Sequence, residues 1–382
     1  MLYRPHWANP AKEPETEAVL ATTTQREITM EQSNPRRDFL KAAAGTGLAA
    51  LAGNAAAQHL GHSVEFKPNT RYPDPSVQIL DPSFGKHRIY SSSVEQLASG
   101  MRWAEGPVYF PAGRYLLMSD IPNNRIMKYD ETNGAFSVFR DNANFANGNA
   151  RDRQGRLVTC EHSVTRRITR TEHNGKITVL ADNYEGKRLN APNDIVVKSD
   201  DSIWFTDPLF GINGEWEGSR AKPEQATTNV YRIGADGKVR AMITDILNPN
   251  GLAFSPDEKK LYVVEWRGTP SRSIWGYDVA ADGSLSGKTK VVDANGPGAL
   301  DGFRVDTEGN LWCGWGSNGS PGAVSADLDG VMVFNPAGKA IGHIRLPERC
   351  ANLTFGGPKN NRLYMTSCHS LYALYVEAHG AT

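Results

Sequence analysis

The sequence predicts an all-β protein whose core is a six-bladed β-propeller, and two observations carry that prediction. One phrase occurs six times: a polar residue able to bind an ion, a short apolar run, a turn with Gly, Pro or Asp, and a second apolar run. The copies begin at Glu105, Asn147, Asn193, Asn250, Asp301 and Asn352. Successive starts lie 42, 46, 57, 51 and 51 residues apart, close to the repeat length of propeller blades, each a small antiparallel sheet.

The repeats account for most of the chain. They cover residues 105–367 and leave no room for a second core, so residues 58–382 are predicted to form one propeller and residues 1–57 a separate extension. Residues 78–101 include the strand-like stretch IYSSSVEQLASGM. We expect it to be the outer strand of the last blade, because pairing the start of the chain with its end closes the ring and protects the strand edges.

The leading residue of each copy is the most informative feature for function. The first strand of each blade lines the central channel of a propeller, so the six leading residues should converge on the axis. Their carboxylates and carboxamides are hard oxygen ligands, which suit Ca²⁺, Mg²⁺ or Mn²⁺. The alternative is that the Asn-Gly and Asp-Gly pairs only make turns. A turn would accept Ser, Gly or Pro as readily, whereas every copy keeps a side-chain carbonyl or carboxylate, which favours an axial cation.

The extension carries an export signal of the twin-arginine kind. Arg36 and Arg37 stand in SNPRRDFLK, ahead of an Ala, Gly and Leu stretch over residues 42–51 and the small-residue cleavage site at 55–57. The apolar stretch is too short for a permanent membrane helix. We therefore expect recognition by the twin-arginine export machinery, a mature protein from about Gln58 in the periplasm, and no membrane association after processing. Met30 competes with Met1 as the start.

The balance of charges limits the classes of partner that the protein could bind. Lys plus Arg equals Asp plus Glu at 42 each, without a basic stripe in the repeats, so nucleic acid and anionic membranes are poor candidates as partners.

The four cysteines are expected to differ in state. Cys160 and Cys313, within second strands, are expected to be buried thiols. Cys350 and Cys368 face each other across the last hairpin, where an oxidising compartment could bridge them, although such bridges are geometrically demanding.

A second, incomplete ring is predicted at the ends of the second strands. Its members are Asp120, Glu161 with His162, Asp207, Glu265, Trp315 and Ser367. Two roles are open for Asp207. Its carboxylate could accept backbone N–H groups in a turn, which would be structural, or it could support the side chain of Asn193. His162 and His369 are the histidines near the expected channel mouth, and histidine is the usual proton carrier near neutral pH, but a lone histidine is more often structural.

Three long loops leave from the same ends of the second strands, over residues 211–229, 267–273 and 315–330. Long irregular loops in compact domains are usually lids or binding loops. Trp216, Trp266 and Trp315 lie in or beside them, which suits either stacking on a sugar ring or surface packing.

Several segments together resemble the senescence-marker-protein/gluconolactonase (regucalcin-like) family of six-bladed propellers, over residues 95–376. They are WAEGPVYF (103–110), RLVTCEHSVTRRITR (156–170), YEGKRLNAPNDIVV (184–197), SIWFTDPLFGI (202–212), PNGLAFSPDEKKLYVVE (249–265) and LDGFRVDTEGNLW (300–312). The resemblance implies a lactone hydrolase that uses one divalent cation, Ca²⁺ being favoured over Mg²⁺, Mn²⁺ or Zn²⁺.

The family pattern also implies roles for particular residues. The metal ligands fall on Glu105, Asn193, Asn250 and Asp301, and Asn193 would also face the substrate. The sequence departs from the family two residues before Asn193, where many members have an arginine that holds a substrate oxygen and this chain has Ala191. Arg188 is near enough to substitute, and a change of substrate is equally allowed. His162 is a further candidate for substrate binding.

The predicted function is metal-assisted hydrolysis of an aldonolactone such as glucono-1,5-lactone. The cation would polarise the lactone carbonyl, and Asp301 is the predicted catalytic base, with Glu161 or Glu265 as alternatives because metal binding lowers the basicity of a carboxylate. The competing hypothesis is a non-catalytic binding or scaffold propeller with a structural calcium ion, since the fold alone proves no function. The two carboxylates Glu105 and Asp301, with neutral asparagines, would leave coordination positions for water, which favours the enzyme.

Overall fold

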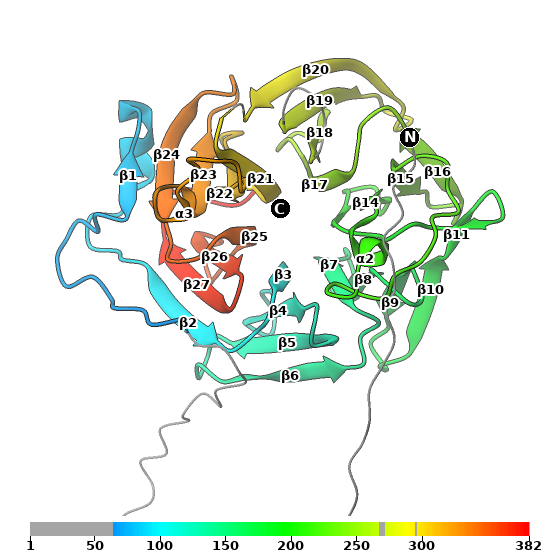
Figure 1. The fold of residues 1–382 in the computed structure, drawn as a ribbon, viewed down its shortest axis with the longest axis horizontal. Coiled ribbons are helices and arrows are strands. Elements are labelled where there is room, and N and C mark those ends of the chain that lie inside the picture. Colours follow the sequence, from blue (N-terminus) through cyan, green and yellow to red (C-terminus); the bar gives the residue numbers. More distant parts are fainter. Residues whose placement is uncertain (1–63, 267–271, 295, 382) are drawn as a thin grey trace, which may run out of the picture. The chain divides into compact units, whose positions relative to one another are not determined.

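The computed structural model describes residues 64–266, 272–294 and 296–381, and in this part of the chain the strands form a six-bladed β-propeller (Figure 1). The predicted fold class is therefore confirmed. The export signal, the boundary at residue 57 and part of the loop at 267–273 lie outside the described residues, so the signal stays a prediction.

Blades one to three are four-stranded antiparallel sheets built in chain order from the axis outward. Blade one contains β3 (Ala104–Phe110), β4 (Tyr115–Asp120), β5 (Arg125–Asp130) and β6 (Phe136–Asp141). Blade two contains β7 (Ala146–Arg151), β8 (Leu157–Glu161), β9 (Arg167–Thr171) and β10 (Ile177–Ala181). Blade three contains β13 (Ile195–Val197), β14 (Ile203–Asp207), β15 (Asn229–Ile233) and β16 (Val239–Ile243).

Blade four follows the same plan, and blades five and six each include one strand from the N-terminal side. Blade four contains β17 (Pro249–Phe254), β18 (Lys260–Glu265), β19 (Ser273–Val279) and β20 (Leu285–Asp293). Blade five contains β21 (Gly298–Val305), β22 (Leu311–Ser317), β23 (Gly330–Phe334), β24 (Ala340–Arg345) and β1 (Val77–Ile79). Blade six contains β25 (Cys350–Gly356), β26 (Arg362–Ser367), β27 (Ser370–Tyr375) and β2 (Glu95–Ser99).

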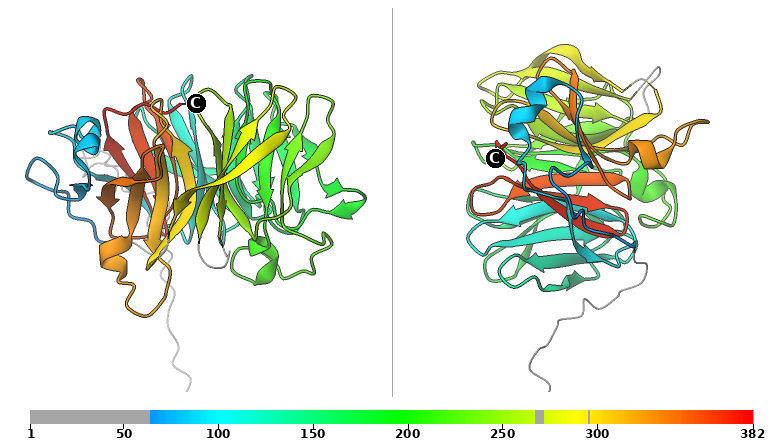
Figure 2. Two further views of the ribbon diagram at one scale, coloured as in Figure 1. Left: turned by 90° about the horizontal axis from the view of Figure 1, so that it is seen from above. Right: turned by 90° about the vertical axis from the view of Figure 1, so that its left-hand side faces the viewer.

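Short elements connect or flank the blades. They are the 3₁₀ helix η1 (Pro82–His87), the hairpin of β11 (Asn183–Tyr184) and β12 (Lys187–Arg188), and the single-turn helices α2 (Phe210–Asn213) and α3 (Ser325–Leu328). The left view of Figure 2 shows the segments with α2 and α3 projecting from one side of the propeller and the C-terminal end on the other. Two of the predicted binding loops thus share a face.

The ring closes as the sequence predicts, through β2 from the N-terminal side. This strand pairs antiparallel with β27, from Glu95 opposite Ala373 to Ser99 opposite Ser370. The expected closing segment is split, however, because β1 pairs with β24 and becomes the fifth strand of blade five. Strands from the N-terminal and C-terminal sides of the propeller therefore share blade six, and β2 covers the edge of β27 that would otherwise be open.

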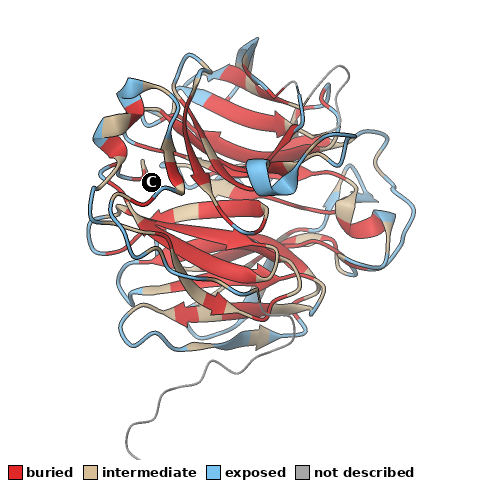
Figure 3. Cartoon of the chain, turned by 60° about the vertical axis from the view of Figure 1, so that its left-hand side comes forward, coloured by how far each residue is buried: buried red, intermediate tan, exposed pale blue. Residues whose placement is uncertain are grey.

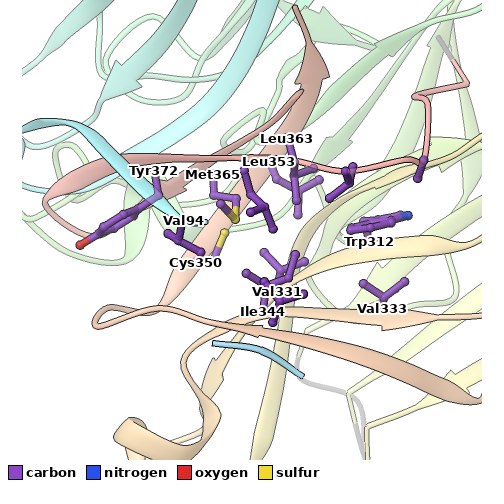
Figure 4. Close-up of a cluster of buried hydrophobic side chains, with 14 of the residues drawn as sticks. Val94, Trp312, Val331, Val333, Ile344, Cys350, Leu353, Leu363, Met365 and Tyr372 are labelled. Carbon is purple, nitrogen blue, oxygen red and sulfur yellow. The ribbon is translucent and has the colours of Figure 1, made fainter. Parts of the chain in front are cut away.

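Burial decreases from the axis outward. All seven residues of β3 are buried, whereas β6 at the rim is mostly exposed, a gradient that Figure 3 shows across the blades. Apolar clusters fill the spaces between blades. In one of them Trp312 and Val331 of blade five meet Cys350, Leu353 and Met365 of blade six (Figure 4). Full burial of a Val, Leu or Met side chain in such a cluster stabilises the fold by about 1.5–3 kcal/mol.

All four cysteines are free thiols, and Cys160 and Cys313 are buried as predicted. Cys350 and Cys368 are also thiols, so the possible cross-strand bridge is not formed. Among the described residues, the helices are all too short and too polar to cross a bilayer.

Candidate active site on the propeller axis

The six leading residues meet at the axis and are joined by hydrogen bonds between side chains. Asn147 Nδ2 donates to Asn193 Oδ1 at 2.7 Å, Asn193 Nδ2 to Asn250 Oδ1 at 2.9 Å, and Asn250 Nδ2 to Asp301 Oδ1 at 2.8 Å. On the other side of the ring, Asn352 Nδ2 donates to Glu105 Oε2 at 3.1 Å. All six side chains are buried. The predicted convergence is therefore found in the structure.

Irregular strand pairing turns these side chains toward the axis. The inner strands β3, β7, β17, β21 and β25 each shift register against their neighbours at or next to the leading residue. Asn193 differs, since it precedes its strand, β13. Bulges of this kind re-aim a side chain and are common next to active sites. The leading residues consequently lie in or beside strands, and the turn interpretation of the Asn-Gly and Asp-Gly pairs is wrong.

The glycines of those pairs let successive inner strands approach closely. A Cβ atom on Gly148 would lie 2.4 Å from the carbonyl oxygen of Asn193, and one on Gly251 would lie 2.7 Å from that of Asp301. A Cβ on Gly302 would lie 2.1 Å from the side chain of Asn352. In each case the contact is with the leading residue of the next blade, so the glycines set the diameter of the ring.

Two carboxyl groups in this buried ring strongly influence each other. Burial, followed by the charges of Asp301 and Asp194, raises the pKa of Glu105 well above its usual range. Burial also raises the pKa of Asp301 to about 6, although the guanidinium of Arg349 opposes the rise. Arg349 Nη2 lies 3.2 Å from Asp301 Oδ2. Negative charge at the axis is thus only partly compensated by the protein.

This donor set fits a hard divalent cation. Glu105, Asn193, Asn250 and Asp301 present carboxylate and carboxamide oxygens, and the two carboxylates are buried and repel each other. Among the described residues, no cluster of three or more His, Cys, Asp or Glu side chains is suited to a metal ion. The ring is not a cluster of that kind, because two of its four candidate ligands are carboxamides.

The second ring has the expected position, and its carboxylates are engaged by neighbouring groups. The donors to Asp120 are Arg102 N at 2.8 Å, Asn123 Nδ2 at 2.8 Å and Arg125 Nε at 2.9 Å. The donors to Glu161 Oε2 are Asn144 Nδ2 at 2.9 Å, Thr165 Oγ1 at 2.5 Å and Arg167 Nε at 2.6 Å. Both carboxylates fix connections at the mouth, which favours a structural role for them.

Asp207 and Glu265 follow the same pattern. Asp207 is fully buried and accepts backbone N–H groups from Asn190 and Ala191, both at 2.8 Å. Asp207 therefore shapes the turn that leads to Asn193. This contact agrees with a structural role in the turn and with a role in supporting Asn193. Glu265 accepts from the backbone N–H of Leu247 at 2.9 Å and from Trp275 Nε1 at 2.8 Å. These contacts leave Glu161 and Glu265 poorly placed to act as the base.

His162 is fully buried at the end of blade two and contacts both the turn before Asn193 and the loop at 211–229. Its Nδ1 lies 2.8 Å from the carbonyl oxygen of Pro192, and its Nε2 lies 3.5 Å from Glu217 Oε2. Glu217 also influences Asp301 on the axis. Burial is the largest cause of the raised pKa of Asp301, and the negative charge of Glu217 raises it further.

The sequence interpretation missed two charged residues at the mouth. Glu217 stands in an irregular loop and Arg349 in the connection before β25, so neither occupies a repeated position. The flanking glycines of Glu217 are a signal that could have identified it, because Gly211 and Gly218 pack directly against His162 and Ser163.

Arg188 does not reach the ring through any contact within the described residues. Its Nη2 donates to the carbonyl oxygens of Val164 at 2.7 Å and Thr165 at 3.1 Å, and its side chain is exposed. Its predicted role in substrate binding stays a prediction. His369 Nδ1 lies 3.0 Å from the carbonyl oxygen of Met101, in the connection between β2 and β3, so it joins blade six to the segment that enters blade one.

The tryptophans of the long loops differ in exposure. Trp216 is exposed, whereas Trp266 packs edge-on against Phe210 at 5.3 Å and Trp315 is buried against Phe334. Trp216 is the one available for stacking on a ligand.

A cavity lies elsewhere in the channel. It has a volume of about 560 Å³ and is lined by later residues of the inner strands, such as Asn149, Ile195 and Arg304, and by Ala381. None of the six leading residues lines it, so we place the candidate site at the ring, where the buried carboxylates and the loops meet.

Comparisons with known proteins agree with this geometry. Residues 103–369 match the family model described as the SMP-30/gluconolactonase/LRE-like region. A gluconolactonase from Zymomonas mobilis is 28% identical over 375 residues, covering 90% of this chain and 98% of that protein. A pentonolactonase from Haloferax volcanii is 26% identical over 271 residues, covering 70% of this chain and 81% of that protein.

A solved structure gives the same result in three dimensions. The gluconolactonase from Xanthomonas campestris is 36% identical, with a TM-score of 0.70, and the match covers 78% of this chain and 94% of that one. The repeat, the axial ring and the matched region together show that this chain belongs to the SMP-30/gluconolactonase/LRE-like family.

Proposed function

We propose that the protein is a divalent-metal-dependent hydrolase of an aldonolactone such as glucono-1,5-lactone. It is a lactone-hydrolysing enzyme of the carboxylic ester hydrolase class, as its gluconolactonase and pentonolactonase relatives indicate. The observation that carries the finer proposal is the axial ring, in which two buried carboxylates and two carboxamides stand beside a guanidinium.

Glu105, Asn193, Asn250 and Asp301 would hold the cation, with Ca²⁺ favoured because the donors are all oxygens. When bound, the cation supplies Lewis-acid polarisation of the lactone carbonyl and stabilises the developing oxyanion. Each side chain in the set is fixed by a neighbour, so little reorganisation is needed before reaction.

The protein's own residues account for substrate orientation and proton transfer. Asp301 would accept a proton from the attacking water, as a carboxylate oriented by Arg349 at the inner edge of the mouth. Asn193 would hold a lactone oxygen, because it is the ring member directly below the turn that His162 and Asp207 support. Trp216 offers an exposed aromatic face for the sugar ring.

The test is a lactonase assay on the mature protein with a chelator and metal add-back, together with Asp301→Asn. The wild-type protein should lose activity with chelator and regain it with Ca²⁺. Asp301→Asn should remain folded and lose about 10²-fold or more in kcat, the range for loss of a general base. A metal-loaded, folded Asp301→Asn protein with full activity would remove Asp301 from the mechanism.

The competing proposal is a scaffold propeller with a structural calcium ion. In that case the chelator would lower the melting temperature, and the wild-type protein would hydrolyse no aldonolactone. The lactonase relatives favour the enzyme over this alternative.

We also propose that the protein works in the periplasm after export by the twin-arginine machinery, with no nucleic acid partner. The support is the order of Arg36-Arg37, the apolar stretch and the cleavage site in the sequence. Replacing both arginines with lysine should leave unprocessed precursor in the cytoplasm, since the receptor reads the arginine pair rather than its charge. Normal processing of that variant would overturn the export proposal.

A further inference from the structure

Glu217 differs from the other carboxylates at the channel mouth. Asp120, Glu161, Asp207 and Glu265 accept at least two hydrogen bonds each from neighbouring groups. Within the described residues, the polar contact that Glu217 makes is with His162 Nε2 at 3.5 Å. Its side chain is 28% exposed, so it can reach a bound molecule.

The position of Glu217 is built into the fold. Gly211 and Gly218, on either side of it, pack so tightly against blade two that a Cβ atom would lie 2.5 Å from His162 Cδ2 and 2.2 Å from Ser163 Cβ respectively. The backbone N–H of Ser219 donates to Ser163 Oγ at 2.9 Å. A side chain longer than hydrogen would displace this part of the loop, so the glycines hold Glu217 over His162.

The two ring nitrogens of His162 face different groups. The carbonyl oxygen of Pro192 can only accept, so Nδ1 carries a hydrogen, and Nε2 then faces the carboxylate of Glu217. A doubly protonated ring facing a carboxylate and a neutral ring facing a protonated Glu217 both place one shared proton between Nε2 and Glu217. Nε2 is buried and makes no hydrogen bond in the present geometry. Glu217 is therefore the group with which Nε2 can exchange a proton.

We propose that Glu217, with His162 as its proton-sharing partner, is the catalytic acid that protonates the ring oxygen of the lactone. This inference rests on the proposed function. Glu217 lies 3.5 Å from His162 Nε2, and His162 in turn contacts the turn before Asn193. The charge of Glu217 also contributes to the raised pKa of Asp301. The site would then contain a base, Asp301, and a separate acid on the loop above it.

The proton balance of the reaction is complete with these groups. The oxygen of water bonds to the carbonyl carbon while its proton passes to Asp301. The bond between that carbon and the ring oxygen then breaks, and the ring oxygen keeps the electron pair. It takes a proton from Glu217, which receives one from His162 Nε2, while Nδ1–H stays on the Pro192 carbonyl oxygen. The product is a hydroxy acid, and exchange with solvent returns the proton from Asp301 to the His162–Glu217 pair.

The experiment compares two leaving groups in wild-type protein, Glu217→Gln and the control Glu215→Gln. Glu215 is an exposed neighbour in the same loop whose ion-pair partner is Arg220 at 4.0 Å. Glucono-1,5-lactone releases an alkoxide, which needs protonation, whereas dihydrocoumarin and 4-nitrophenyl acetate release phenolates, which do not. Glu217→Gln should lower kcat on gluconolactone by about 10²-fold or more, change KM little, and retain most activity on the phenolate substrates.

Further measurements separate this inference from the proposed function. Ca²⁺ affinity by calorimetry and the melting temperature should match the wild type in Glu217→Gln, and Glu215→Gln should match it throughout. His162→Gln keeps a donor toward Glu217 but supplies no proton, so its loss should again be confined to gluconolactone. Wild-type kcat in Glu217→Gln, or equal losses on all substrates, would overturn the acid role. A wild-type protein without lactonase activity would instead overturn the proposed function.

Discussion

Arg349 and Asp301 form an ion pair at the propeller axis, with Nη2 3.2 Å from Oδ2. Arg349 comes from the connection between β24 and β25, and its Nη1 also donates to the Ser317 carbonyl oxygen at 3.2 Å. Gly316 makes room for it, since a Cβ there would lie 2.5 Å from Arg349 Cγ. The pair therefore links blade five to the start of blade six and fixes the direction in which Asp301 presents its carboxylate.

Removing this guanidinium should reduce turnover without unfolding the protein. Arg349→Met keeps the apolar part of the side chain, but Asp301 loses its orienting partner, and we expect kcat to fall by about 10- to 100-fold. Arg349→Lys should recover part of that loss. The control is Arg345→Met, whose ion pair with Asp327 is at the exposed rim. Similar kcat values in Arg349→Met and wild type would show that Asp301 needs no such partner.

The glycines of the axial ring should be sensitive to a single added methyl group. Gly302→Ala would bring a Cβ to 2.1 Å from the Asn352 side chain, and we expect a loss of about 1–3 kcal/mol in the free energy of unfolding, as for other overpacked sites. Gly214→Ala is the matched control, because a Cβ at that position would meet no atom within 4 Å. Urea unfolding of both variants is the measurement, and equal stabilities would contradict the proposed role of Gly302.

Stability should decline on the acidic side partly through His343. Burial lowers the pKa of this histidine to about 4, while the hydrogen bond to the Leu328 carbonyl oxygen opposes the shift. The unfolded chain therefore binds the proton more tightly than the folded one, and the contribution of His343 is present above about pH 6.5 and lost as the pH falls toward 4. His343→Gln should flatten the stability profile across that window in urea unfolding at several pH values. An unchanged slope would exclude His343 as a cause.

The ring could be predicted from sequence because its residues occupy one repeated position. Glu105, Asn250 and Asp301 each follow the same periodicity and precede a glycine, and the propeller geometry then brings them together whatever the loops do. The closing strand β2 could be predicted for a similar reason, since an open ring would leave strand edges unpaired.

The charged residues at the mouth depend on contacts that no periodicity encodes. Arg349 lies in a connection, and Glu217 is positioned by the packing of Gly211 and Gly218 on blade two. The prediction for Arg188 relied on sequence distance from Ala191, but the backbone carbonyls of residues 164 and 165 bind its guanidinium. Local sequence spacing does not show which of several acceptors an exposed arginine reaches.

Asn193 offers the most direct test of whether the ring serves catalysis as well as stability. Its amide both accepts from Asn147 and donates to Asn250, so Asn193→Ala leaves a buried donor and a buried acceptor unpaired, each costing about 1–3 kcal/mol. Asn147→Ala is the matched control, because it breaks the same chain of hydrogen bonds at its first member but removes no proposed ligand of the cation or the lactone. Both variants should melt at lower temperature than the wild type, while Asn193→Ala alone should lose about 10²-fold or more in kcat/KM on gluconolactone. The measurements are turnover and melting temperature with and without Ca²⁺, and equal turnover by the two variants would show that Asn193 acts only in holding the ring together.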